Sequence, residues 1–172
     1  MINKNVTEED LMAAAGAAFS SGWDQMKLYF MIGLPTETDE DVLGIAELAN
    51  RVLQLGREIR GREKKAGRVK VHVSVSSFVP KSHTPFQWEA QDTVAELLRK
   101  QDLLRRALKD RGIKFSWHDV RVSYLESVFA RGDRRVAKAL EAAFRRGCKF
   151  DSWSDCFAYD TWMDAFAEVG VD

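Results

Sequence analysis

Cysteine is scarce in this sequence, and its placement excludes most cysteine chemistry. Cys148 and Cys156 lie eight positions apart, a spacing that fits neither a CxxC metal-binding hook nor a disulfide framework. The ligands of a metal ion usually come in closer clusters. We therefore interpret both residues as ordinary reduced thiols of an intracellular protein and predict no metal site.

Net charge and long apolar runs are missing as well. The 26 basic and 26 acidic side chains cancel, so no overall field favours nucleic acid or an anionic membrane as a partner. No apolar stretch approaches the roughly 20 residues of a transmembrane helix. The first residues, MINKNVTEED, contain no apolar signal segment. We expect a cytoplasmic protein that binds neither a membrane nor nucleic acid.

Two stretches have the pattern of β-strands, and a chain of 172 residues with 45% hydrophobic residues can bury a core around them. Residues 26–32, MKLYFMI, form an almost unbroken apolar run, which is typical of a strand covered on both faces. In residues 69–76, valines alternate with Lys70, His72, Ser74 and Ser76. That period of two predicts a strand with one polar face, which must look at water or at a ligand cavity.

Helical signals surround these strands. Thr7 and Thr38 each precede acidic residues and an apolar periodicity, as helix N-caps do. The first helix should run to Gly22 and the second to about Gly56. Between Gly56 and Lys70, charge and glycine erase the pattern. We predict a solvated connector there, with nucleic-acid contact as a minor alternative.

The second half of the chain predicts three more helices. One spans about 92–111, with Gly112 as its stop; its inward residues are Val94, Leu97, Leu98, Leu104 and Leu108. Residues 113–122 contain a possible third strand, interrupted at Trp117-His118-Asp119. Residues 124–132 and 133–147 predict two short helices, the second capped by Asp133. The aromatic residues near the C-terminus indicate a tail that packs on the body.

This alternation of helices and strands predicts an α/β fold with right-handed βαβ units and a mostly parallel sheet. A closed barrel of eight such units needs about 250 residues. The chain can therefore hold only part of a (β/α) barrel, or a small open sheet.

Two loop segments follow the predicted strands and are candidates for a ligand site. Gly33 permits close backbone approach, Pro35 fixes the turn, and the next helix start offers free amide donors. Residues 76–86, SSFVPKSHTPF, offer hydroxyls, an aromatic ring, a lysine and a histidine. Ligands gather beyond the carboxyl ends of parallel strands, so both segments could wall one site. A plain turn with solvent-facing serines explains the same residues, and no triad or carboxylate pair predicts a catalytic residue.

Three blocks of the sequence resemble the later part of radical S-adenosylmethionine enzymes. They are MKLYFMIGLPTETDEDVLGIAELA (26–49), VSVSSFVPKSHTPFQW (73–88) and FSWHDVRVSYLESVFARGDRR (115–135). The closest resemblance is to the group that carries a cobalamin-binding-type domain before the radical domain. It extends over nearly the whole chain, and the third block is the most specific to that group.

The resemblance implies a fold and a cofactor site. In that superfamily a 4Fe–4S cluster, bound by three cysteines of a CxxxCxxC loop, donates an electron to S-adenosylmethionine, which yields methionine and a 5′-deoxyadenosyl radical. Residues 1–122 would form a partial (β/α) barrel, and residues 123–172 a small helical C-terminal extension packed on it. The strand ending in MIGLP would lie near the adenosine, and VHVSVSSFVP would line the cavity. The implied cofactor-binding residues are Gly33, Leu34, Pro35, Ser74, Ser76, Phe78 and Pro80.

The sequence departs from the family at the iron–sulfur cluster. It has no CxxxCxxC, and Tyr29 stands where the family usually has glycine. A cluster needs thiolates that converge on it, so we expect this chain alone to hold no cluster, to retain no cofactor and to be inactive.

Three hypotheses about function follow. The chain is a C-terminal fragment of a radical S-adenosylmethionine enzyme, whose partner is the missing N-terminal half of the barrel. Alternatively, it is a non-catalytic binding or assembly module that forms a homo-oligomer through open barrel edges. A third hypothesis is binding of S-adenosylmethionine without catalysis.

Overall fold

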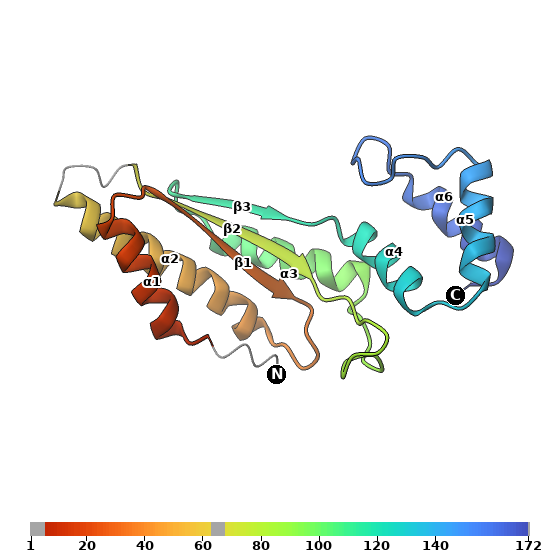
Figure 1. Cartoon of the computed structure of the whole chain (residues 1–172), viewed down its shortest axis with the longest axis horizontal. Helices are drawn as coiled ribbons and strands as arrows, with labels where there is room; N and C mark the ends of the chain where they lie inside the picture. The colour runs from red at the N-terminus through yellow and green to blue at the C-terminus, as the bar shows by residue number, and fades with distance from the viewer. Residues whose placement is uncertain (1–5, 63–67, 172) are drawn as a thin grey trace. The chain divides into compact units, whose positions relative to one another are not determined.

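The computed structural model describes residues 6–62 and 68–171 of the chain. They form a mixed α/β structure with three strands and six helices (Figure 1). The chain divides into two compact units: Met1–Ser77 with Ala95–His118, and Phe78–Val94 with Asp119–Asp172. Each unit is described by itself. None of the described helices has the length and apolar character that crossing a membrane requires.

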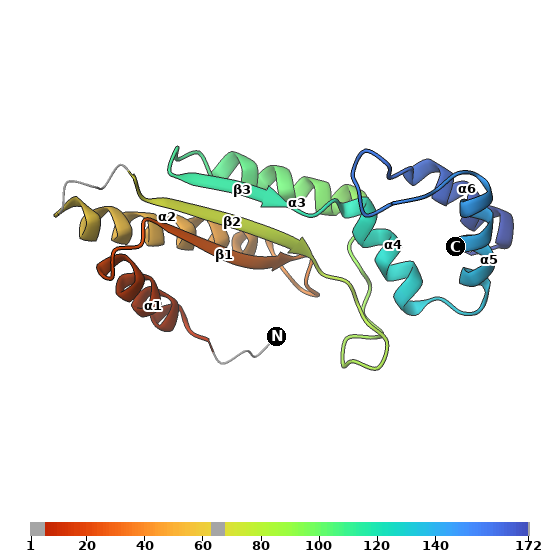
Figure 2. The same cartoon turned by 45° about the horizontal axis from the view of Figure 1, so that its top comes forward.

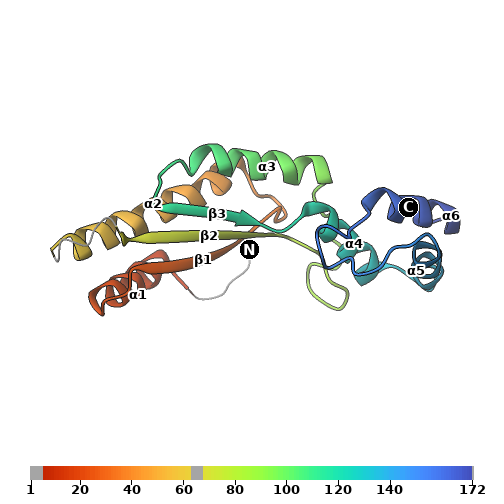
Figure 3. The ribbon, with the colours of Figure 1, turned by 90° about the horizontal axis from the view of Figure 1, so that it is seen from above.

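The first unit is built on a three-stranded parallel sheet in the order β1-β2-β3 (Figure 3). The strands are β1 (Gln25–Ile32), β2 (Lys70–Ser77) and β3 (Ile113–Trp117). The register pairs Gln25 with Lys70 and Ile32 with Ser77, so the carboxyl ends of β1 and β2 lie side by side. The predicted parallel sheet is thereby confirmed; a barrel is not among the observed features.

Three helices belong mainly to the first unit: α1 (Glu8–Ser20), α2 (Asp39–Gly61) and α3 (Val94–Ala107). As predicted, Thr7 and Thr38 cap α1 and α2, each in a reciprocal capping box with the acid three residues later. Helix α2 contacts all three strands, and α1 packs on α2. Figure 2 looks onto the face of the sheet that α2 and α3 do not cover, and these two helices lie behind the strands.

The prediction that β1 is covered on both faces is wrong. Leu28 and Ile32 are buried beneath the helices, but Tyr29 is 74% exposed and Met31 37% exposed. These residues alternate along the strand, so their side chains point to opposite faces. Among the described residues, helices cover only one face. We call the other the open face of the sheet.

Helix α2 is longer than the sequence suggested. It continues past Gly56 to Gly61, because Arg60 is buried and its Nε donates to Asp24 Oδ1 at 2.9 Å. The prediction of a solvated connector is thus wrong for residues 56–61. Its remainder falls largely on residues 63–67, which lie outside the described residues.

Helix α3 ends at Ala107, four residues before the predicted end. In the segment after the helix, the Asp110 carboxylate accepts from the Gly112 N–H at 2.7 Å and from both terminal nitrogens of Arg57. Gly112 therefore lies in the turn before β3 and is not the stop of the helix. Leu98, predicted to point inward, is 47% exposed.

The second unit contains α4 (Val120–Arg131), α5 (Arg135–Arg145) and α6 (Tyr159–Val169). Helix α4 begins earlier than predicted, because the Asp119 side chain accepts from the Arg121 N–H and caps it. The N-cap residue of α5 is Arg134 and not Asp133 as predicted, although the Asp133 side chain accepts from the Arg135 N–H at 2.8 Å. The core of the unit joins all three helices: Leu125, Ala139, Ala142, Ala143, Cys148, Trp162, Ala165 and Phe166.

Candidate functional site

The carboxyl ends of β1 and β2 bring five of the seven candidate residues into one unit. Gly33, Leu34 and Pro35 directly follow Ile32, which pairs with Ser77. Ser74 and Ser76 are half-buried and share the open face of the sheet with Tyr29 and Met31, their partners in β1. The structure therefore places the Gly33 turn beside the polar end of β2, as the parallel register requires.

The Gly33 turn is held by groups of the chain itself. Gly33 has a φ of +80°, in the left-handed region that glycine tolerates. Its N–H donates to Glu37 Oε2 at 2.8 Å, and the same oxygen lies 2.8 Å from Lys100 Nζ. Thr36, a β-branched residue, also has a positive φ of +66°. Strain of that kind persists only where surrounding contacts hold it.

The start of α2 offers fewer donors than the sequence suggested. The Thr38 N–H donates to Asp41 Oδ2 at 2.8 Å, and the Asp41 N–H donates to Thr38 Oγ1 at 3.3 Å. The expectation of free amides at this helix start is therefore wrong for the N–H groups of Thr38 and Asp41. The capping box already satisfies these two groups.

The open face carries cross-strand rows of polar side chains. His72 lies between Lys27 and Lys114, and Ser74 between Tyr29 and Ser116. His72 Nε2 and Ser116 Oγ share a hydrogen bond of 2.7 Å. Burial lowers the pKa of His72, and the charges of Lys27 and Lys114 lower it further. The imidazole is therefore mostly neutral at pH 7.

The other two candidate residues belong to the second unit and pack inside it. Phe78 is 5% exposed, and its ring meets Phe86 edge to face at 5.8 Å. The Phe78 carbonyl accepts a hydrogen bond from Gln91 Nε2 at 3.1 Å. Pro80 is buried as well. Both residues thus have packing roles within their own unit.

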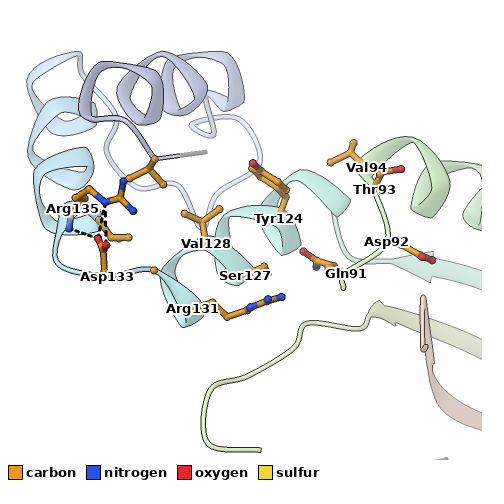
Figure 4. Close-up of a pocket in the computed structure, with 13 residues that line it drawn as sticks. Gln91, Asp92, Thr93, Val94, Tyr124, Ser127, Val128, Arg131, Asp133 and Arg135 are labelled. Atoms are coloured by element: carbon orange, nitrogen blue, oxygen red, sulfur yellow. Dashed lines mark hydrogen bonds and ion pairs between the residues drawn. The ribbon is translucent and has the colours of Figure 1, made fainter. Parts of the chain in front are cut away.

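A pocket of about 580 Å³ in the second unit was missed by sequence reasoning (Figure 4). Residues 91–94, helix α4 and the start of α5 line it. Helix α4 contributes Tyr124, Ser127, Val128 and Arg131. Their spacing of three, four and seven positions is the signal that could have predicted a shared helix face. Arg131 Nη1 donates to the Glu89 carbonyl, and the charge of Arg135 is balanced by Asp133 at 3.0 Å.

Metal-binding groups do not assemble in the described parts of the chain. Within residues 6–62 and 68–171, no three side chains of histidine, cysteine, aspartate or glutamate converge as ligands. Cys148 is buried in the core of the second unit, whereas Cys156 is exposed.

Comparisons with known proteins give one relative. An uncharacterized protein of Methanocaldococcus jannaschii is 32% identical over 170 residues, which cover 99% of this chain and 35% of that relative. The chain thus spans about a third of the length of the curated relative that it matches. No protein family model matches the chain. No solved structure matches it significantly.

Proposed function

We propose that this chain is the C-terminal part of a radical S-adenosylmethionine enzyme, with β1, β2 and β3 as consecutive strands of its (β/α) barrel. The main support is the sheet itself: three parallel strands have helices on one face and a largely polar open face. In a barrel the helices form the outer layer and the opposite face points inward. The sequence blocks that resemble the superfamily coincide with β1, β2 and β3 and the segments that follow them.

The proposed cofactor wall lies at the carboxyl ends of β1 and β2. Gly33, Leu34 and Pro35 would lie beside the adenosine, and Ser74 and Ser76 would line the cavity. Leu34 and Pro35 are half-buried and offer apolar surface of the kind that suits a nucleobase. Phe78 and Pro80 follow β2 directly in the chain and are buried within the second unit.

The residues present do not fit an iron–sulfur cluster. A 4Fe–4S cluster of this class needs three convergent thiolates. This chain has two cysteines, one in the core of the second unit and one exposed. In the proposal the cluster loop therefore comes from a preceding half of the barrel, and this chain contributes no redox step. The match to 35% of a longer relative is consistent with a sequence that occurs within a larger protein.

A chimera tests this proposal. The longer relative would be reconstituted with iron and sulfide without oxygen, and the products of dithionite reduction with S-adenosylmethionine would be quantified. We expect 5′-deoxyadenosine and methionine. A chimera that carries this chain in place of the matching third should retain the cleavage. Gly33→Val in the chimera should suppress it, and Gly44→Val, inside α2 where an added Cβ meets nothing within 4 Å, should not.

Two results would overturn the proposal. One is a relative that binds no cluster under these conditions. The other is an active relative whose chimera folds, binds the cluster and still leaves S-adenosylmethionine intact. The isolated chain provides a further control: a 4Fe–4S absorption band after its reconstitution would contradict the statement that it cannot hold the cluster.

A second candidate function is assembly without catalysis. Among the described residues, β1 and β3 each pair only with β2, so both outer edges of the sheet are open. Open edges and exposed apolar side chains such as Tyr29 favour association with another subunit. Light scattering after size exclusion measures this directly. A stable dimer that Tyr29→Lys dissociates would favour assembly, and a monomer at all concentrations would exclude it.

A further inference from the structure

A basic cavity lies at the amino-terminal ends of the strands of the first unit. It has a volume of about 550 Å³ and is lined from all three strands and from Arg111. Five of the lining side chains can carry positive charge: Lys27, Lys70, His72, Arg111 and Lys114. None of the described residues that line it has a carboxylate. For a chain with zero formal charge, this concentration of one sign is unusual.

The sheet register places a lysine on each side of His72. Lys27 pairs with His72 across β1 and β2, and His72 pairs with Lys114 across β2 and β3. Like charges directly opposite on neighbouring strands destabilise a sheet. The two lysines therefore help to keep the ring neutral, and a charged ring needs a compensating anion.

The basic side chains find little compensation inside the chain. Lys27 Nζ lies 4.7 Å from the centre of the Tyr29 ring, and Lys70 Nζ donates to the Arg111 carbonyl at 3.2 Å. Within the described part of the chain, no carboxylate forms an ion pair with Lys27 or Lys114. The charge of Lys70 contributes to the lowered pKa of Asp110, but that carboxylate is bound by both terminal nitrogens of Arg57 at 2.8 and 2.7 Å.

We propose that this cavity binds a multiply charged phosphate anion, such as a diphosphate or the phosphate group of a small ester. Lysine and arginine side chains are the usual ligands of phosphate oxygens in proteins. Lys70 lies on one cross-strand row of the sheet, and Lys27 and Lys114 lie on the next row of the same face, which suits an anion with more than one charge. The volume of the cavity exceeds what a single inorganic phosphate fills. The cavity lies at the opposite end of the strands from the Gly33 turn, so this inference does not depend on the function proposed above.

The pKa of His72 should respond to an anion bound in the cavity. Its ring faces Lys27 and Lys114 and shares a hydrogen bond with Ser116 Oγ. The two lysines disfavour the charged imidazolium, whereas a bound anion favours it. Binding should therefore raise the pKa of His72.

The test is an NMR titration of the full chain with pyrophosphate, with sodium chloride at equal ionic strength as the control. We expect pyrophosphate, but not sodium chloride, to raise the pKa of His72. Lys27→Gln with Lys114→Gln should weaken binding about fivefold, given the strength of exposed ion pairs. Lys109→Gln with Lys138→Gln removes the same charge from exposed positions outside the cavity and should leave the affinity unchanged.

Three results would overturn the inference. Chloride could reproduce the shift of His72, which would show general screening. The two double variants could weaken pyrophosphate binding equally, which would show a response to net charge alone. Binding to an oligonucleotide or to anionic phospholipid vesicles without binding to pyrophosphate would assign the surface to a macromolecule or a membrane. Circular dichroism of each variant confirms that it is folded.

Discussion

Lys100 Nζ lies 2.8 Å from Glu37 Oε2, and the two side chains are only 5% and 6% exposed. Lys100 comes from α3, and Glu37 from the turn that follows β1. The same carboxylate oxygen accepts the Gly33 N–H at 2.8 Å. One buried ion pair therefore joins a helix to the end of a strand and fixes the conformation of the glycine turn.

Removing one partner of this pair should destabilise the protein strongly. Lys100→Met leaves the Glu37 carboxylate buried without its cation, and a broken buried pair typically costs about 3–5 kcal/mol. Urea unfolding followed by circular dichroism measures the loss. The double variant Glu37→Gln, Lys100→Met should recover most of it, because no buried charge is left. If the single variant lost less than about 1 kcal/mol, the side chains would not be a buried, mutually dependent pair.

The backbone of Gly33 predicts a cost for any side chain at that position. With a φ of +80°, Gly33→Ala should lower the free energy of unfolding by about 1–2 kcal/mol. Gly44→Ala is the matched control, because Gly44 lies inside α2 and a Cβ there would meet nothing within 4 Å. That change should stabilise the protein by about 0.5–1 kcal/mol. Thermal unfolding of both variants checks the opposite signs; equal signs would contradict the left-handed turn.

Signals that are local in sequence predicted local structure well. Thr7 and Thr38 were recognised as caps because a capping box involves residues three positions apart. The alternating valines of β2 gave its buried face correctly, since a period of two marks the two faces of a strand. The positions of these helices and strands together predicted the parallel sheet, in which the carboxyl ends of β1 and β2 are neighbours.

The features that sequence reasoning missed depend on distant residues. Glu37 and Lys100 are 63 positions apart, and nothing near either residue marks the other as its partner. Gly56 lies inside helix α2 and does not stop it: an added Cβ there would lie within 2.8 Å of the Phe19 and Val69 side chains, so the glycine serves close packing. The apolar run of β1 also does not predict whether other elements cover one face of the strand or both.

The two thiols should differ in reactivity. Cys148 is 7% exposed, and its pKa is raised by burial and by the nearby Asp151 carboxylate. Cys156 is exposed. Because the thiolate is the reactive form, a disulfide reagent should modify one thiol rapidly in the native protein and the second only on unfolding. Cys156→Ser should abolish the rapid phase and Cys148→Ser should preserve it. The reverse assignment would contradict the packing of the second unit.

The contact between Arg57 and Asp110 predicts a pH dependence of stability. The guanidinium hydrogen bonds lower the pKa of Asp110 to about 2, and the Gly112 N–H contributes to the same shift. A carboxyl group with a lowered pKa stabilises the folded state above its unfolded pKa of about 3.9. That contribution is lost as the pH falls from about 4 to about 2. Since both side chains are 32% exposed, solvent screening reduces it to about 1 kcal/mol.

Asp110→Asn isolates this contribution, because an asparagine oxygen can still accept the Gly112 N–H but carries no charge to pair with Arg57. At pH 6 the variant should be less stable than the natural sequence by about 1 kcal/mol, the size of the discounted pair. At pH 2 most of the difference should be gone, because the Asp110 carboxyl is then protonated in the unfolded state and about half protonated in the folded state. Urea unfolding across this range measures the difference directly. A gap that stays constant from pH 6 to pH 2 would mean that Arg57 stabilises the turn through packing and not through the charge of Asp110.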